Sequence, residues 1–151
     1  MGEVVRMVPA AFEHREQWAR LRAMLWDEPS TDEHQADIVR QLKEPARFCC
    51  FVARRDAGDI VGFAEASLRQ DYVNGCATSP VAFLEGLFVR ADHRRRGIAT
   101  MLCAEVASWG KSLGCTEFAS DALLDNHDGH RFHAALGFAE TERVVYFNRA
   151  I

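Results

Sequence analysis

The sequence predicts a mixed α+β domain in which a central sheet is flanked by helices. Two apolar runs, residues 48–54 and 60–68, flank the turn residues 56–59, as in a β-hairpin. A third apolar run, residues 83–89, is short and is followed by charged residues and glycine, which favours a strand. From Ile98 onward, apolar residues recur at the spacing of one helix face.

The elements before the hairpin follow from the same patterns. Residues 3–8 form a short first strand, and residues 12–26 carry a helical apolar stripe. A second helix follows, and its N-cap is Ser30, Thr31 or Asp32.

The elements after the hairpin begin with a polar, turn-rich loop over residues 69–80, in which Asn74–Gly75 is the clearest turn. Gly114 ends the helix that begins at Gly97. The remaining expected elements are a central strand over 83–89, a helix over 97–113, a strand over 115–121, a helix capped by Asp125 or Asn126 that runs through Leu136, and two final strands over 138–142 and 144–147.

The bulk composition limits the protein class. The 151 residues suit one domain, so we expect a single domain over residues 1–151. Hydrophobic content of 48% and charged content of 26% are typical of globular proteins. The net charge of −4 argues against nucleic-acid and anionic-membrane partners. No apolar run approaches the roughly 18 residues of a membrane span.

The cysteines and the N-terminus indicate a cytoplasmic protein. The five cysteines are scattered, none forms a Cys-x-x-Cys pair, and the N-terminus lacks a secretory pattern. These features favour reduced thiols, and we assign the cysteines no chemistry.

A basic turn separates the central strand from the following helix. Arg94, Arg95 and Arg96 precede Gly97, and unpaired N–H groups at a helix start attract anions. The turn is therefore a candidate phosphate site. The alternative is a solvated basic loop that only connects the two elements.

The first two helices meet at an acidic stretch. It holds Asp27, Glu28, Asp32, Glu33 and Asp37. A solvated acidic surface explains the stretch, and a rim that attracts a polyamine is the alternative.

The element order, the Arg-x-x-Gly-x-Ala turn and the ending Ala135-Leu-Gly-Phe138 resemble the GNAT acetyltransferases along nearly the whole chain. Within that group, short motifs resemble the aminoglycoside 6′-N-acetyltransferases: Phe63-Ala-Glu-Ala-Ser67, Asp71-Tyr-Val-Asn-Gly-Cys76, Phe83-Leu-Glu-Gly86, Ala119-Ser-Asp121 and Glu140-Thr-Glu-Arg-Val144. The resemblance implies the GNAT acyl-CoA N-acyltransferase fold with a mixed, splayed sheet. It also implies acetyl-CoA as co-substrate, an aminoglycoside as acceptor and a homodimer.

The resemblance also implies residues that bind the cofactor. The backbone of Leu87, Phe88 and Val89 would hold the pantetheine arm, and backbone donors there would stabilise the oxyanion. The pyrophosphate would be held by Arg94, Arg95, Arg96, Gly97, Ile98, Ala99 and Thr100. Asn126 matches a position that contacts the cofactor arm, and a role as N-cap explains it equally well.

Five residues match positions that contact the drug in the resembled family: Trp26, Tyr72, Glu85, Asp121 and Glu142. Asp121 is the expected base, because the attacking amine must lose a proton, and Glu85 is the other candidate to take it, directly or through water. A turn or N-cap aspartate is the alternative. Glu85 is expected to bind the drug, because strand alternation would put it on the face of Leu87 and Val89. Trp26 could instead be a core residue, and Glu142 could come from a partner chain or merely flank a strand.

The general acid is the point where the chain departs from the family. Many GNAT enzymes place a tyrosine four residues before the final glycine, and here that residue is His133. Histidine donates protons near neutral pH, so His133 is a candidate acid, although the thiolate could leave unassisted. We expect no metal site, because His127 and His133 lie on different sides of one helix.

The sequence thus predicts a cytoplasmic enzyme that transfers acetyl from acetyl-CoA to the 6′-amine of aminoglycosides by direct attack in a ternary complex. No cysteine lies beside a base as a nucleophile would, which agrees with direct attack. The alternatives are a GNAT enzyme for another small amine or a protein N-terminus, and a non-catalytic acetyl-CoA-binding module.

Overall fold

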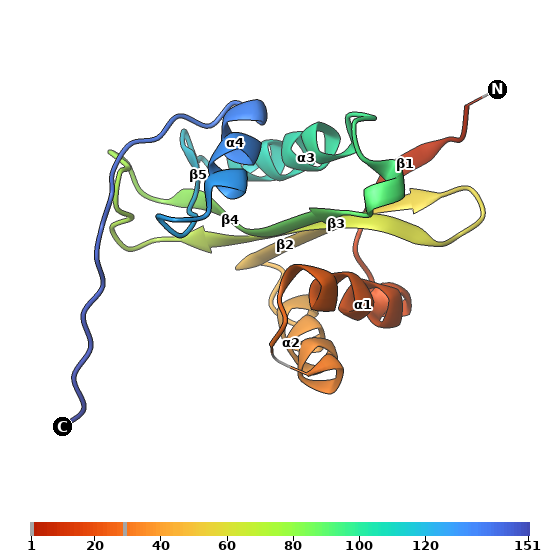
Figure 1. The fold of residues 1–151 in the computed structure, drawn as a ribbon, viewed down its shortest axis with the longest axis horizontal. Coiled ribbons are helices and arrows are strands. Elements are labelled where there is room, and N and C mark those ends of the chain that lie inside the picture. Colours follow the sequence, from red (N-terminus) through yellow and green to blue (C-terminus); the bar gives the residue numbers. More distant parts are fainter. Residues whose placement is uncertain (1, 29) are drawn as a thin grey trace.

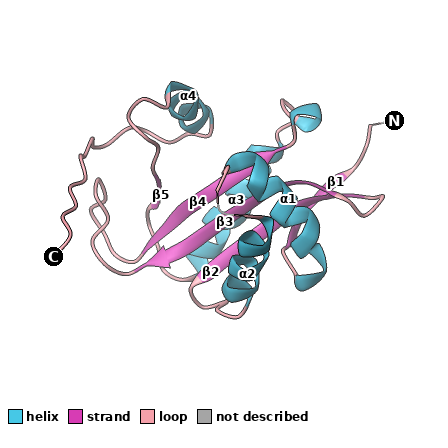
Figure 2. Cartoon of the chain, turned by 60° about the horizontal axis from the view of Figure 1, so that its bottom comes forward, coloured by secondary structure: helices cyan, strands magenta, loops and turns pink. Residues whose placement is uncertain are grey.

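The computed structural model describes residues 2–28 and 30–151. Its centre is a five-stranded sheet in the order β1-β2-β3-β4-β5. All neighbours are antiparallel except β4 and β5, which run parallel. The strands are β1 (Val5–Pro9), β2 (Phe48–Arg55), β3 (Ile60–Arg69), β4 (Val81–Val89) and β5 (Phe118–Ser120). Figure 2 shows their arrangement. The predicted hairpin is β2–β3, and the predicted mixed fold is confirmed.

The helices lie on both sides of the sheet (Figure 1). One side carries α1 (Arg15–Leu25), preceded by a short 3-10 turn (Phe12–His14), and α2 (Thr31–Leu42). The other carries α3 (Ile98–Ser112) and α4 (His127–Ala135). Ser30 is the N-cap of α2: its Oγ accepts from Glu33 N, and the Glu33 carboxylate accepts from Ser30 N. This reciprocal pair fixes where α2 begins.

Each face of the sheet has its own core. Leu102 and Val106 of α3 pack on Ala64 and Leu87 on one face. On the other face, Trp18 of α1 and Ile38 of α2 pack on the centre of the sheet. Because both faces are covered, β3 is buried along most of its length.

A β-bulge interrupts the pairing of β3 with β4. Glu65 pairs with Gly86, and the next residue, Ala66, pairs with Leu84, so Glu85 is the extra residue of β4. The bulge changes the alternation of the strand. Leu84 and Leu87, three residues apart, both belong to the core under α3.

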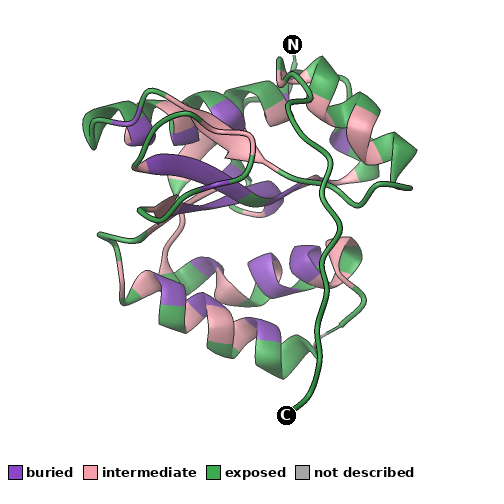
Figure 3. Cartoon of the chain, turned by 90° about the vertical axis from the view of Figure 1, so that its left-hand side faces the viewer, coloured by how far each residue is buried: buried purple, intermediate pink, exposed green. Residues whose placement is uncertain are grey.

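The C-terminal end differs most from the sequence prediction. The strand predicted over 115–121 shortens to Phe118–Ser120, and the strands predicted over 138–142 and 144–147 do not form. Residues 138–151 run as an extended tail from the α4 side of the sheet toward the α1–α2 side (Figures 1 and 3). A strand needs a neighbouring edge for its backbone hydrogen bonds. The tail pairs with no strand among the described residues, so its apolar pattern was read wrongly as sheet.

Candidate active site

The site is built around the place where β4 and β5 separate. Their pairing covers Ala82–Leu84 with Phe118–Ser120 only. Beyond it, β4 continues through Val89, and no described strand pairs with that edge. The backbone of Leu87, Phe88 and Val89 therefore lies at an open edge, where an extended ligand can add as a strand does.

The basic turn lies at the far end of the same strand. Arg95 has a φ of 62° and Gly97 a φ of 78°, so the backbone turns sharply before α3. The first α3 hydrogen bond runs from Met101 N to Gly97 O. The N–H groups of Ile98, Ala99 and Thr100 precede it and are free to bind an anion.

The three arginines of the turn have different surroundings. Arg94 Nε donates to the carbonyl of Val89 at 2.9 Å, so this side chain folds back and closes the end of β4. The guanidinium of Arg96 lies 3.7 Å from the carboxylate of Glu3. All three arginines were expected to help hold the pyrophosphate, and the structure gives Arg94 a bond to the backbone of β4 in addition.

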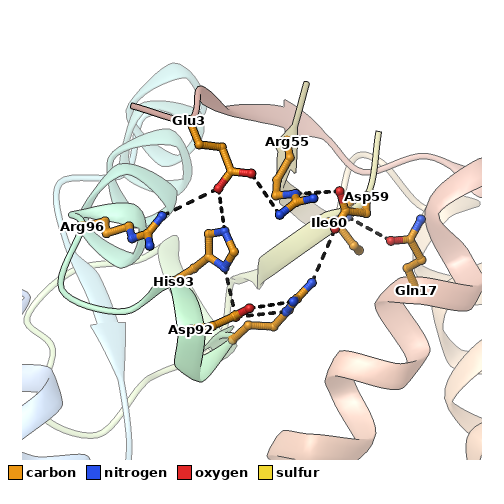
Figure 4. A network of polar contacts seen from close by, with 9 residues as sticks. Glu3, Gln17, Arg55, Asp59, Ile60, Asp92, His93 and Arg96 are labelled. Atoms are coloured by element: carbon orange, nitrogen blue, oxygen red, sulfur yellow. Dashed lines mark hydrogen bonds and ion pairs between the residues drawn. The ribbon is translucent and has the colours of Figure 1, made fainter. Parts of the chain in front are cut away.

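A polar network links the turn to neighbouring segments (Figure 4). The ring nitrogens of His93, which is buried, lie 2.8 Å from Glu3 and 2.9 Å from Asp92. Hydrogen bonds from His93 and Arg90 lower the pKa of Asp92 to about 2. Glu3 also pairs with Arg55 of β2 at 2.9 Å. The network joins the N-terminal segment, the β2–β3 hairpin and the turn.

On the opposite face of β4 lies a cavity of about 990 Å³. Its walls come from α1, α2, β3 and the loop between β3 and β4. Three of the five expected drug contacts, Trp26, Tyr72 and Glu85, line it together. Tyr72 is 75% exposed, which agrees with its reading as a residue outside the core.

Glu85 reaches this cavity because of the bulge. The expectation that it shares a face with Leu87 and Val89 is wrong: those two pack under α3, whereas Glu85 lines the cavity on the other side. Ser67 donates to its carboxylate at 2.6 Å and Arg69 at 2.9 Å. These bonds hold the group as a fixed carboxylate, which suits binding of a cation better than uptake of a proton.

Gly86, the next residue, makes room for Trp26. A Cβ at Gly86 would lie 2.5 Å from Trp26 Cζ2, closer than atoms pack. Trp26 also stacks on His34, with ring centroids 6.4 Å apart and planes at 24°. The indole is thus held against the strand as a wall of the cavity.

The floor of the cavity holds a buried charged cluster that sequence reasoning missed. Glu65, 1% exposed, accepts from Trp18 Nε1 at 2.9 Å and from Gln41 at 2.8 Å, and lies 3.1 Å from Arg22 Nε. Burial raises the pKa of Glu65. Arg22 also binds Asp37 at 2.6 Å. The signal was present, because a glutamate in the apolar run 60–68 needs a partner.

Asp121, Asn126 and Glu142 lie around the mouth of the site. Asp121 directly follows β5 and is exposed. Asn126 caps α4, where its Oδ1 accepts from Gly129 N at 3.0 Å, so the N-cap reading is confirmed. Glu142 passes the Asn74–Gly75 turn, its Cβ 3.7 Å from where a Cβ at Gly75 would lie.

His133 faces the β4–β5 split rather than solvent alone. Its Nε2 lies 2.7 Å from the Ser120 hydroxyl, and its Nδ1 lies 2.6 Å from the carbonyl of Gly129. Ser120, which sequence reasoning did not select, stands between His133 and β4. Only the folded position of α4 over β5 reveals this pair.

Two further expectations can be set against the structure. Within residues 2–28 and 30–151, no group of three or more histidine, cysteine, aspartate or glutamate side chains is placed to hold a metal ion. Over the same residues, no helix is long and apolar enough to cross a membrane.

Comparisons with known proteins show which family this chain belongs to. The model of the acetyltransferase (GNAT) family matches residues 15–138. An aminoglycoside N(6′)-acetyltransferase type 1 from Acinetobacter genomosp. 13 is 49% identical over 134 residues, which cover 89% of this chain and 90% of the relative.

Two solved structures are similar over nearly their whole length. One is aminoglycoside 6′-N-acetyltransferase AAC(6′)-Ih from Acinetobacter baumannii, with TM-score 0.93 and 44% identity over 98% of this chain and 99% of that chain. The other is AAC(6′)-Iy in complex with the bisubstrate analogue CoA-S-monomethyl-acetylneamine, with TM-score 0.91 and 42% identity over 98% and 99%. The resemblance inferred from the short motifs is confirmed.

Proposed function

Because this chain belongs to the acetyltransferase (GNAT) family, we propose that it transfers the acetyl group of acetyl-CoA to the 6′-amine of aminoglycoside antibiotics. The bulge in β4 is the observation that carries the proposal. It turns Glu85 toward a cavity whose walls hold aromatic side chains, carboxylates and arginines, while Leu87 to Val89 stay at an open edge that leads to the basic turn. One strand thus serves a cationic acceptor and an anionic donor.

Acetyl-CoA supplies the activated acetyl group, and its chemistry fits the residues of the donor side. The β4 backbone holds the pantetheine arm, and N–H groups there stabilise the negative charge that develops on the thioester oxygen. The turn from Arg94 to Thr100 binds the pyrophosphate through backbone N–H groups and positive charge. Asn126 Nδ2 adds a donor from the start of α4.

The acceptor lies in the cavity on the other face. A protonated aminosugar pairs with the fixed carboxylate of Glu85, and its ring packs on Trp26 and Tyr72. Glu142 adds a carboxylate where the tail passes the loop that carries Tyr72. These contacts set the position of the 6′-amine relative to the thioester.

The reaction is direct attack in a ternary complex. Asp121, exposed beside the split, takes a proton from the 6′-ammonium directly or through a water, because only the neutral amine has a lone pair to attack with. His133 is the candidate source of the proton that the departing thiolate takes up. An Asp121→Asn enzyme should lose about 10²-fold in kcat/KM; an unchanged rate across pH would remove the assignment.

The protein forms a homodimer through its C-terminal tail. Val145, Tyr146 and Phe147 are 73%, 79% and 93% exposed, which is unusual for neighbouring apolar side chains in a lone domain. A second copy offers the sheet edge that the tail lacks in this chain. The whole chain, residues 1–151, is one domain in this arrangement, and it acts in the cytoplasm.

One assay tests the activity. CoA release is followed with acetyl-CoA and a panel of aminoglycosides that carry a 6′-amine or a 6′-hydroxyl. Turnover is expected with the 6′-amino compounds only. The absence of turnover with every 6′-amino compound would refute the proposed function, and turnover of a small non-sugar amine alone would replace the substrate class.

A further inference from the structure

Ser120 occupies a special position in the sheet. It is the last residue of β5 that pairs with β4, opposite Leu84, so it stands where the two strands separate. Its hydroxyl oxygen lies 3.3 Å from the Leu84 carbonyl and 2.7 Å from Nε2 of His133. The side chain is half-buried. Three elements, β4, β5 and α4, therefore meet at one hydroxyl group.

The hydrogen bonds of His133 define how protons are arranged in this pair. Nδ1 faces the carbonyl of Gly129 at 2.6 Å, and a carbonyl can only accept, so Nδ1 carries a hydrogen. In the neutral ring, Nε2 is then an acceptor. The single hydrogen of the Ser120 hydroxyl has two acceptors in reach, Nε2 of His133 at 2.7 Å and the Leu84 carbonyl at 3.3 Å, and the shorter contact favours donation to Nε2. The ring of Phe138 packs edge-on against the imidazole, with centroids 5.5 Å apart, and fixes its plane.

Ser120 and His133 together are arranged as a proton relay, whereas a single acid would present its own N–H to the ligand. Since Nε2 is occupied by Ser120, His133 does not present a free N–H to a ligand at the split. The Ser120 hydroxyl lies at the last β4–β5 pair, beside the Leu84 carbonyl and next to the start of the open edge, and it bonds the imidazole. In the proposed function, the thioester lies along this edge, and the inference rests on that placement.

We propose that Ser120 is a catalytic residue that carries protons between the reacting atoms and His133, in both directions. When the neutral amine attacks, its nitrogen forms the new C–N bond and becomes positively charged. A proton passes from this nitrogen to Ser120 Oγ as the Ser120 proton passes to His133 Nε2. When the C–S bond breaks, its electron pair stays on sulfur; Ser120 gives a proton to the thiolate and recovers one from Nε2.

The relay balances without any other reactant. The amine nitrogen loses one proton, the sulfur gains one, and Ser120 and His133 return to their starting state. One oxygen can serve both steps because nitrogen and sulfur are bonded to the same carbon in the tetrahedral intermediate. Asp121 keeps its separate task of neutralising the ammonium group before attack.

The test compares Ser120→Ala, Ser120→Thr, His133→Phe and the double variant Ser120→Ala/His133→Phe in kcat with a 6′-amino aminoglycoside. Ser120→Ala and His133→Phe should each lower kcat by about 10²-fold. The double variant should be no slower than either single one, because both remove one relay. Ser120→Thr keeps the hydroxyl and should keep most of the rate. Kd for CoA, measured by calorimetry, should not change in any variant.

Matched controls are Ser112→Ala, whose hydroxyl donates to the Trp109 carbonyl, and His130→Phe on the same helix as His133. Both should turn over at the wild-type rate. The proposal is overturned if Ser120→Ala stays within about twofold of wild type, or if the two single effects multiply in the double variant. An acetyl group found on Ser120 by mass spectrometry would overturn it in favour of a nucleophilic serine. If the wild-type enzyme itself fails to turn over, the proposed function fails instead.

Discussion

Residues 5–112 and residues 116–151 are packed in different ways. In the first region, both faces of the sheet carry fully buried side chains such as Trp18, Phe63 and Val106. In the second region, no residue is buried, and α4 has no buried side chain (Figure 3). The first region supplies its own core. The second holds Ser120, Asp121, Asn126, His133 and Glu142, so much of the proposed chemistry stands on the less packed part of the molecule.

The difference indicates that the two regions contribute different properties to the protein. Burial gives the first region its stability, because hydrophobic burial is the dominant favourable contribution to folding. The second region gains little from its own contacts, so its apolar side chains and its polar groups stay exposed. Four variants measure this contrast, from the largest expected loss of stability to the smallest.

Glu65→Leu should produce the largest loss. It leaves Arg22 buried without one of its two carboxylates, and breaking a buried ion pair costs about 3–5 kcal/mol. Urea unfolding measures the change. Glu140→Leu removes an exposed partner of Arg143 in the second region and should leave the unfolding midpoint unchanged. Equal effects of the two variants would contradict the contrast.

Gly86→Ala should have the next largest effect. The added methyl group collides with the Trp26 indole, and overpacking of this kind costs about 1–3 kcal/mol. Because Trp26 walls the acceptor cavity, KM for the aminoglycoside should rise while KM for acetyl-CoA stays the same. Gly2→Ala, where a Cβ meets open space, is the control. A rise in both KM values would mean that Gly86 supports the donor edge as well.

Asp92→Asn should change the acid sensitivity of the first region. The pKa of Asp92 is lowered in the folded protein to about 2, so its contribution to stability is present above the ordinary aspartate value and is lost as pH falls toward about 2. The melting temperature of the wild-type protein should therefore fall over this interval, and that of the variant should fall less. Parallel curves would show that His93 and Arg90 do not stabilise the Asp92 carboxylate.

Phe147→Asp should have the smallest effect on the stability of a single chain, within about 0.5 kcal/mol, because the ring is 93% exposed. Its effect should appear in assembly instead. Sedimentation should show a dimer for the wild-type chain and a monomer for the variant. A variant that unfolds more easily at a concentration where both proteins are monomeric would show that the tail packs on its own domain.

Local patterns in the sequence were enough to predict most of the first region. The β2–β3 hairpin, the cap of α2 among three candidates and the helix after the basic turn all follow from residues close together in the chain. Glu65 was missed although it carries the same signal as Glu85, a carboxylate in an apolar strand. Its partners Trp18, Arg22 and Gln41 lie far away in sequence, so only the fold reveals them.

The bulge and the tail could not be predicted, for a common reason. Both depend on backbone pairing with a neighbouring strand: the bulge on the register of that pairing, and the tail on whether a free strand edge is present. Alternation placed Glu85 with Leu87, and the register against β3 reverses that choice. Alternation also predicted two final strands, yet no described edge is available to pair with them. The drug-contact residues came from the resemblance to a family, and the structure brings Trp26, Tyr72 and Glu85 to one cavity without testing their roles.

The extra residue in β4 also affects how this protein can evolve. Substitutions on the Glu85 side of the bulge alter the lining of the acceptor cavity, while Leu84 and Leu87 keep their places under α3. Point substitutions in the cavity lining could therefore change which aminoglycosides are accepted, while the residues proposed to bind acetyl-CoA stay in place. Deletion of Glu85 would leave a regular β3–β4 ladder with Leu84 and Leu87 still on one face, and would remove only the carboxylate from the cavity.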